Sequence, residues 1–240
     1  MAKGFTFKQF HVDDLGCGMP VSTDGVLLGA WAKLQPQGEI LDIGTGSGLL
    51  ALMAAQRTNA NAKPHRITAL DIDSSAIKAA RHNFAHSPWH ARLQAEHQDV
   101  LAWLTSRPAH SIDTIVCNPP YFNFGEQAQC DKRATARHTD TLDHQALIAA
   151  IKTLLTPTGV ASFILPEYEG RQFITAANEY GLYCQSLCEI RTTEKKPVGR
   201  LLFALTPKSC ETEIEQLCIH HQGQYSDAFI ALTRHFYLNM

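Results

Sequence analysis

Short apolar runs rich in β-branched residues alternate with segments of helical spacing along most of this chain, and few folds accept such an alternation. The expected strands span residues 39–43, 66–70, 92–97, 113–117 and 160–165. The helices expected between them span residues 49–57, 74–85, 100–105 and 143–155. Strands that alternate with helices predict βα units, and therefore a mostly parallel sheet with helices on both faces.

The pattern changes after about residue 170. Two further strands are expected at 182–191 and 199–205, and the link between them is too short for a crossover helix. These strands should be antiparallel neighbours, so the sheet is expected to carry an antiparallel strand at or near one edge.

Helices are also expected near both ends of the chain. Residues 225–238 suggest an amphipathic helix, and residues 26–34 an apolar helix that Thr23 or Asp24 could cap. We expect a single domain with an N-terminal extension and helix at 1–38, a catalytic core at 39–205, and a C-terminal strand and helix at 206–240.

Composition excludes several classes of protein. A net charge of −2 excludes a generally basic protein that coats nucleic acid, but it leaves room for local basic patches. No apolar run approaches the ~18 residues of a membrane-spanning helix. The 7 cysteines are scattered, which favours reduced thiols in a soluble cytoplasmic protein. His82 and His86 are four residues apart, but Pro88 breaks the helix before His90, so no metal site is expected.

A glycine-rich turn follows the first strand of the core. Gly44, Gly46 and Gly48 fall where the strand ends and a helix begins, and a missing Cβ there lets the backbone approach a ligand. A dinucleotide fingerprint would need glycine at position 49, which is leucine, so a pyrophosphate ligand is disfavoured. By itself the turn is also compatible with a tight connection that binds nothing.

Carboxylates follow the next two strands. Asp71 can accept hydrogen bonds from both hydroxyls of a ribose, and Ile72 would then lie against an adenine face. Asp73 is better explained as the cap of the following helix. Asp99 can accept from an adenine amino group or cap its own helix, and both roles remain open.

Together these residues resemble the S-adenosylmethionine-dependent methyltransferases of the Rossmann-like class. The resemblance implies a three-layer fold on a seven-stranded sheet whose seventh strand is antiparallel, between the fifth and the sixth. It also implies that Gly44 and Gly46 approach the methionine part of S-adenosylmethionine, Asp71 the ribose and Asp99 the adenine. Thr23, Asp24, Asp42, Gly48 and Asn118 are assigned to the same cofactor site.

Asn118-Pro119-Pro120-Tyr121 follows an apolar strand and is the most informative stretch. Consecutive prolines stiffen the turn and remove two N–H donors, which leaves a site rich in acceptors. The Asn118 side chain and the Pro119 carbonyl can each accept one N–H of a planar amino group, and Tyr121 can stack on the attached ring. We therefore assign Asn118, Pro119 and Tyr121 to the catalytic site.

The same four residues match the motif of methyltransferases that act on adenine N6, cytosine N4 or the amide of glutamine. Over nearly the whole chain the sequence resembles the bacterial tRNA(Val) adenine-37 N6-methyltransferases, through residues 5–12, 23–32, 118–122 and 225–238. The resemblance implies tRNA as substrate. Another amino group, in protein, ribosomal RNA or DNA, and an RNA-binding module without activity remain as alternatives.

Two basic clusters offer contacts to RNA phosphates. One contains Arg191, Lys195, Lys196 and Arg200 against Glu194, a net charge of +3; the other contains Lys132, Arg133 and Arg137 against Asp131, a net charge of +2. Residues 122–140 are expected to form a mobile lid or an RNA-contacting loop. We expect Tyr121, with Phe122, to stack on an extruded adenine. The expected partner is tRNA and no membrane is expected; the oligomeric state stays open, with a monomer as the simpler expectation.

Overall fold

The computed structural model describes residues 4–17, 20–60, 65–119 and 144–240. Within these ranges the chain builds a nine-stranded sheet in the order β11-β10-β8-β9-β7-β6-β3-β4-β5. The strands are β3 (Glu39–Ile43), β4 (Arg66–Asp71), β5 (Leu93–His97), β6 (Ile112–Cys117), β7 (Leu155–Pro166), β8 (Tyr183–Thr193), β9 (Arg200–Thr206), β10 (Glu213–His221) and β11 (Gln224–Tyr225).

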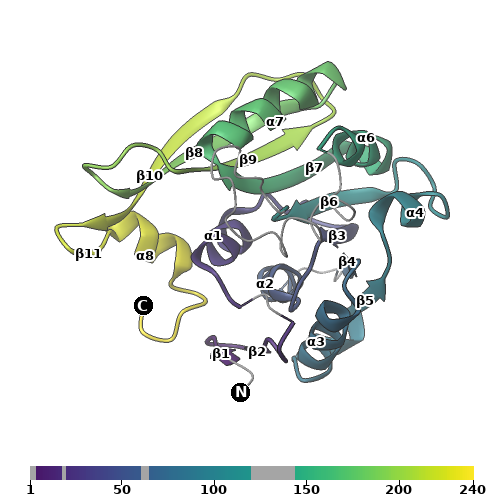
Figure 1. Ribbon diagram of the computed structural model, residues 1–240, viewed down its shortest axis with the longest axis horizontal. Helices are drawn as coiled ribbons and strands as arrows, with labels where there is room; N and C mark the ends of the chain where they lie inside the picture. Colours follow the sequence, from purple (N-terminus) through teal and green to yellow (C-terminus); the bar gives the residue numbers. More distant parts are fainter. Residues whose placement is uncertain (1–3, 18–19, 61–64, 120–143) are drawn as a thin grey trace, which may run out of the picture.

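Helices cover both faces of this sheet (Figure 1). One layer contains α1 (Thr23–Trp31), α2 (Leu49–Arg57), α3 (Ser74–Ala85) and α8 (Asp227–Thr233), and the other contains α4 (Val100–Leu104), α6 (His144–Leu154) and α7 (Glu167–Glu179). A single 3₁₀ turn, η1 (His90–Arg92), precedes β5 among the described elements. Strand residues alternate between the layers: Ile40 packs with α2 and α3, whereas Leu41 packs with α4 and α6. Apolar residues on both sides therefore bury the central strands.

The predicted α/β class, with helices on both faces of a mostly parallel sheet, is confirmed. The antiparallel strand implied by the resemblance is also confirmed, because β9 pairs antiparallel with both β7 and β8. The predicted count of seven strands is wrong. Beyond β8, strand β10 pairs in parallel with it and β11 pairs with the end of β10, so these two strands extend the sheet past the edge at which the predicted seven strands would end.

Helix α7 is absent from the sequence prediction. Its buried residues, Gly170, Phe173 and Ala177, follow the spacing of one helix face, but many of its other residues are polar, so the average hydrophobicity of the segment is low. A Cβ on Gly170 would lie 3.1 Å from Leu201 Cδ1, so the glycine lets the helix approach β9 closely. This amphipathic spacing was the available signal for the helix, and packing of its buried face against β9 stabilises it.

The two ends of the described chain pack together (Figure 1). An antiparallel pair, β1 (Gly4–Thr6) and β2 (His11–Asp13), precedes α1. Lys8 donates its backbone N–H to the Phe236 carbonyl and its ammonium to the Met240 carbonyl. The predicted helix at 225–238 is too long, because Ser226 caps α8 and the helix ends at Thr233, after which Phe236 is buried among N-terminal aromatic residues.

Candidate functional site

The strand register brings the ends of four neighbouring strands together at the carboxyl edge of the sheet. Ile43 of β3 lies opposite both Leu70 of β4 and Cys117 of β6. Because adjacent strands lie roughly 5 Å apart, Gly44, Asp71 and Asn118 leave the sheet side by side. Asp71 lies opposite His97 of β5, so Asp99 follows on the far side. The order along this edge is Asp99, Asp71, Gly44, Asn118, which is where open α/β sheets bind ligands.

The glycine turn adopts a conformation that side chains resist. Gly44, Gly46 and Gly48 have φ values of 71°, 55° and 89°. A Cβ on Gly44 would meet no atom within 4 Å, so this face of the turn is open. A Cβ on Gly48 would lie 2.6 Å from Phe84 Cε1. Gly44 is therefore placed to face a ligand, whereas packing against α3 explains the glycine at position 48.

Asp71 organises the turn as well as offering a ligand site. One carboxylate oxygen accepts the Gly46 N–H at 2.8 Å and the other accepts the Asp73 N–H at 2.9 Å. A carboxylate has about four acceptor positions, so hydroxyl groups of a ligand can still bind. Ile72 is 51% exposed beside it, which is unusual for an isoleucine and suits a flat apolar partner.

Two further carboxylates cap helices. Asp73 caps α3 by accepting from Ser75, as predicted. Asp99 caps α4, and its Oδ1 accepts from the backbone of Leu101 and Ala102. The capping role of Asp99 is therefore observed, and its role toward adenine stays a prediction.

Asp42 lies behind the turn and is fully buried. Its Oδ2 accepts from the Thr45 hydroxyl at 2.6 Å and from the Ala51 N–H at 3.1 Å, whereas Oδ1 has no hydrogen-bond partner among the described residues. Burial raises the pKa of Asp42 to about 7, against the lowering effect of the Thr45 and Ala51 hydrogen bonds. Asp42 thus supports the turn from inside, and its assignment to the cofactor site stays a prediction.

This shift in pKa makes folding stability depend on pH. The pKa of Asp42 is higher in the folded state than in the unfolded state. The resulting stabilisation is fully present below the unfolded value of 3.8 and is lost as the pH rises through about 7. As the pH rises between these two values, the unfolding free energy of the wild-type protein should fall by up to about 4 kcal/mol more than that of the Asp42→Asn variant, whose amide cannot ionise. Urea denaturation of both proteins at pH 5 and pH 8 covers about two pH units of this range and should show a difference of about 3 kcal/mol. Parallel pH profiles would contradict the assignment.

Asn118 presents an acceptor without a partner. Its Oδ1 is buried and makes no hydrogen bond to any residue that the structure describes. An unpaired buried acceptor costs roughly 1–3 kcal/mol, so an incoming N–H donor would be favoured here.

Burial raises the pKa of the preceding Cys117 thiol well above its usual range, with Asp42 and Asp71 adding to the effect. Cys117 is therefore held as a neutral thiol and is a poor nucleophile.

The amino end of α1 lies beside the amino end of α2. A Cβ on Gly25 would come within 2.9 Å of Leu49 Cδ2. The helix is capped by Ser22, whose hydroxyl accepts from Gly25, so the prediction that Thr23 or Asp24 caps it is wrong. Asp24 instead accepts from Arg200 Nε at 2.9 Å. This ion pair occupies two residues that were predicted for different ligands, the cofactor and RNA.

The cluster Arg191, Lys195 and Lys196 lies at the same edge of the sheet, because β8 runs parallel to β7. β8 is three strands from β6, which corresponds to roughly 14 Å. Lys195 and Lys196 are exposed, and Arg191 donates to Gln216. Tyr121, Phe122, Lys132, Arg133 and Arg137 lie outside the described residues.

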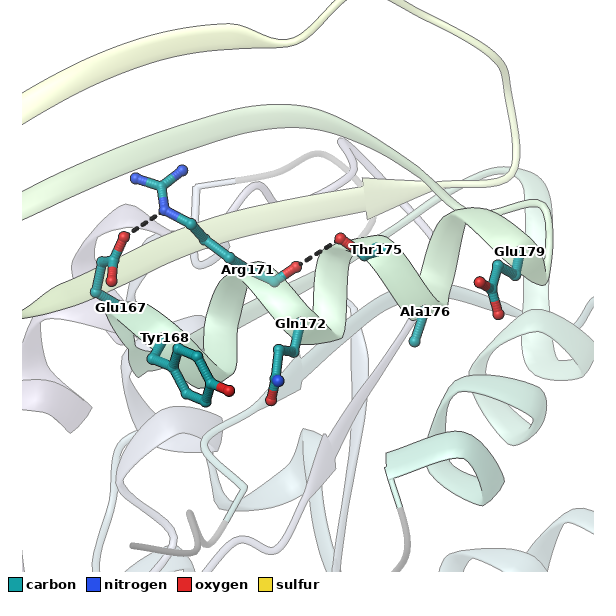
Figure 2. A pocket seen from close by; sticks show the side chains of 7 residues that line it. All are labelled: Glu167, Tyr168, Arg171, Gln172, Thr175, Ala176 and Glu179. Atoms are coloured by element: carbon teal, nitrogen blue, oxygen red, sulfur yellow. Dashed lines mark hydrogen bonds and ion pairs between the residues drawn. The ribbon is translucent and has the colours of Figure 1, made fainter. Parts of the chain in front are cut away.

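A separate hollow runs along α7 (Figure 2). Its lining includes Glu167, Tyr168, Arg171 and Glu179, and Arg171 pairs with Glu167 and with Glu189. Carboxylates outnumber cations there, so this surface does not suit a polyanion.

In the described ranges no group of three or more His, Cys, Asp and Glu side chains could hold a metal ion. None of the described helices is long and apolar enough to cross a membrane.

Asn83 was missed by the sequence analysis. It lies on the buried side of α3 with Ile77, Ala80 and Phe84. Its side chain donates to the Ser47 carbonyl of the glycine turn at 2.8 Å. A polar residue on an otherwise apolar helix face was the available signal.

Comparisons with known proteins identify related methyltransferases. A family model described as "Methyltransferase small domain" matches residues 22–164. A Photobacterium profundum protein named tRNA1(Val) (adenine(37)-N6)-methyltransferase is 61% identical over 242 residues, covering 100% of both chains. A Vibrio campbellii protein of the same name is 54% identical, covering 99% of this chain and 97% of the relative.

Solved structures share the fold at low sequence identity. A predicted O-methyltransferase from Agrobacterium tumefaciens aligns with a TM-score of 0.66 at 17% identity, covering 89% of this chain and 96% of the other. Pyrococcus horikoshii TYW2 in complex with MeSAdo aligns with a TM-score of 0.57 at 14% identity, covering 85% and 70%.

Proposed function

The chain belongs to the methyltransferase small-domain family and, within it, to the tRNA1(Val) (adenine(37)-N6)-methyltransferases, and from this premise we propose that it transfers a methyl group from S-adenosylmethionine to N6 of adenine 37 in tRNA1(Val). The observation that carries the proposal is the order Asp99, Asp71, Gly44, Asn118 along one sheet edge. Asn118, whose Oδ1 has no hydrogen-bond partner among the described residues, follows the strand next to the one that leads into the open glycine turn, and this supports a role for Asn118 as the acceptor for an amino group.

The residues present fit this cofactor. Asp71 retains acceptor capacity for the two ribose hydroxyls, and the exposed Ile72 offers a surface for the adenine ring. Gly44 leaves space for the methionine portion at the turn. When bound, S-adenosylmethionine supplies an electrophilic methyl group on a positively charged sulfur.

The acceptor side of the reaction depends on orientation. The lone pair of an adenine amino group is delocalised into the ring, so this nitrogen is a weak nucleophile. Asn118 Oδ1 and the Pro119 carbonyl would each accept one N–H and direct the lone pair toward the glycine turn. The methylated nitrogen then carries a positive charge and loses a proton to water, so no strong base is needed.

Mass spectrometry of nucleosides from digested tRNA1(Val) tests the proposal. After incubation of unmodified tRNA with the protein and S-adenosylmethionine, N6-methyladenosine should form at position 37, and a tRNA with guanosine at that position should remain unmodified. Parallel incubations with DNA, ribosomal RNA and protein extracts examine the other amino groups. Methylation confined to one of those pools, or no methyl transfer with RNA still bound, would refute the proposal.

The exposed lysines of the β8–β9 link should contribute to tRNA affinity. Replacing Lys195 and Lys196 together by alanine should weaken tRNA binding and lower the slope of log affinity against log salt concentration by about 2, because each lysine at a phosphate contributes about 1. Binding titrations between 50 mM and 200 mM salt measure the slope.

Lys208→Ala is the matched control. This residue is exposed and follows β9, which runs antiparallel to β7, so it lies at the opposite edge of the sheet. Its removal should leave the slope unchanged. Equal effects of the two substitutions would show that the β8–β9 link is not a specific contact.

A further inference from the structure

Asn83 is an uncharged polar residue in a buried position of α3. Its side chain is 2% exposed, among Ile77, Ala80 and Phe84. Burying an amide without hydrogen bonds is energetically costly, because the group loses its hydrogen bonds to water. An asparagine at such a position is expected to have specific partners.

All the hydrogen-bonding groups of this side chain are directed at backbone. Asn83 Oδ1 accepts the Asp13 N–H at 2.9 Å, and Nδ2 donates to the Asp13 carbonyl at 2.9 Å. The second proton of Nδ2 is donated to the Ser47 carbonyl at 2.8 Å. Because one end faces an N–H and the other faces two carbonyl oxygens, the orientation of the amide is determined.

The contact to Ser47 restrains the peptide at the centre of the glycine turn. On one side, the Gly46 N–H is held by Asp71, and on the other side Gly48 packs on Phe84. The start of the turn is held by the Leu70 carbonyl, which accepts from Gly44 and Thr45. The turn is thus anchored to β4 and to α3, and Asn83 supplies the side-chain hydrogen bond from α3.

The contact to Asp13 joins a second element to the same place. The amide pairs with both backbone groups of Asp13, as a neighbouring strand would, and so attaches β2 to α3. The carboxylate of Asp13 points elsewhere, toward His11 and His82 at 3.2 Å and 3.4 Å. The buried side chain of Asn83 therefore holds both the N-terminal segment and the glycine turn against α3.

We propose that Asn83 is a positioning residue for the cofactor, which keeps the Ser47 peptide and the N-terminal segment in the arrangement that binds S-adenosylmethionine. This inference rests on the proposed function, because it assumes that the cofactor occupies the glycine turn. A turn held in its binding conformation before the ligand arrives loses less conformational entropy on binding. Asn83 should therefore contribute mainly to cofactor affinity and little to the transfer step.

The Asn83→Asp variant tests this with almost no change of volume. Its carboxylate keeps an acceptor for the Asp13 N–H but turns the other oxygen toward two carbonyl oxygens. At pH 8 we expect the Kd for S-adenosylhomocysteine, measured by calorimetry, to rise at least tenfold. The KM for S-adenosylmethionine should rise in parallel, while kcat at saturating cofactor and the KM for tRNA stay within threefold of wild type.

Lowering the pH should partly rescue the variant. A carboxyl group surrounded by carbonyl oxygens has a raised pKa, and its protonated form donates one hydrogen bond. The ratio of variant to wild-type Kd should therefore fall between pH 8 and pH 6. Because protonation would also restore stability, the ratio is compared only where thermal denaturation shows that the variant is fully folded at both pH values, so that the change reports affinity and not unfolding. If Asn83→Asp does not fold, Asn83→Ser replaces it, because serine offers a shorter polar group. In that variant too, the KM for S-adenosylmethionine should rise while kcat stays close to wild type.

Asp13→Asn is the matched control, because it alters the same segment on its exposed side and leaves the backbone contacts to Asn83 in place. It should bind S-adenosylhomocysteine as wild type does. Wild-type affinity in the Asn83 variants, or a loss confined to kcat, would overturn the positioning role. Failure of the wild-type protein to bind S-adenosylhomocysteine would instead overturn the proposed function, and this inference with it.

Discussion

Asn118→Ala is expected to lower the rate of methyl transfer to tRNA by roughly 10²- to 10³-fold, the range found when one oriented hydrogen-bonding group is removed from a reaction centre. The substitution removes the buried Oδ1 acceptor at the end of β6, so the target amino group is no longer oriented. Single-turnover assays with saturating S-adenosylmethionine and tRNA measure the transfer step without product release.

Two measurements distinguish this effect from misfolding. Asn118→Ala should bind tRNA within about threefold of wild type, because the basic cluster is untouched, and any loss of affinity for S-adenosylhomocysteine should be much smaller than the loss of rate, because Asp71 is untouched. Asn118→Asp keeps an acceptor oxygen but replaces the amide NH₂ by a second acceptor, so its rate should fall between those of wild type and alanine. Transfer by Asn118→Ala at the wild-type rate would show that the acceptor lies elsewhere.

The Asp71→Ala variant is expected to show no binding of S-adenosylhomocysteine at micromolar concentrations of this ligand. The carboxylate orients the Gly46 and Asp73 backbone and is the proposed acceptor for two ribose hydroxyls. Each hydrogen bond to a charged group contributes about 1.5–3 kcal/mol, so the loss of two of them should raise the Kd for S-adenosylhomocysteine by at least 10²-fold. Calorimetric titration measures this directly.

Asp73→Ala is the control for that substitution. Asp73 is two residues further along, carries the same charge, and caps α3 through Ser75. Loss of the cap should lower the unfolding free energy by about 1 kcal/mol and leave cofactor affinity within about threefold of wild type. Equal losses of affinity in the two variants would mean that local charge, and not the position of Asp71, determines binding.

Much of the fold was predictable because its signals are local. The strand ends that carry Gly44, Asp71 and Asn118 were identified from apolar runs and turn residues, which depend on neighbours in sequence. The cap at Asp73 was also predicted for this reason. The resemblance supplied the position of β9, which periodicity placed only at or near an edge of the sheet.

Other features were not predictable because they depend on residues far apart in the chain. The close packing of α7 on β9 depends on the approach of Gly170 to Leu201, and the extended edge of the sheet depends on the pairing of β10 with β8. Arg200 was expected to be available to RNA because of its basic neighbours, yet it pairs with Asp24, 176 residues away. No sequence window contains both partners of such a contact.

The chemical groups that follow each core strand can be read from the amino-acid sequence, since a strand end and a glycine turn are specified by adjacent residues. Tertiary structure alone decided which of these groups became neighbours and which were already occupied. The strand register placed Asn118 beside the glycine turn, and Asn83 contacts Ser47 and Asp13 across 36 and 70 residues. The physical reason is that packing brings together groups whose separation along the chain carries no local signal.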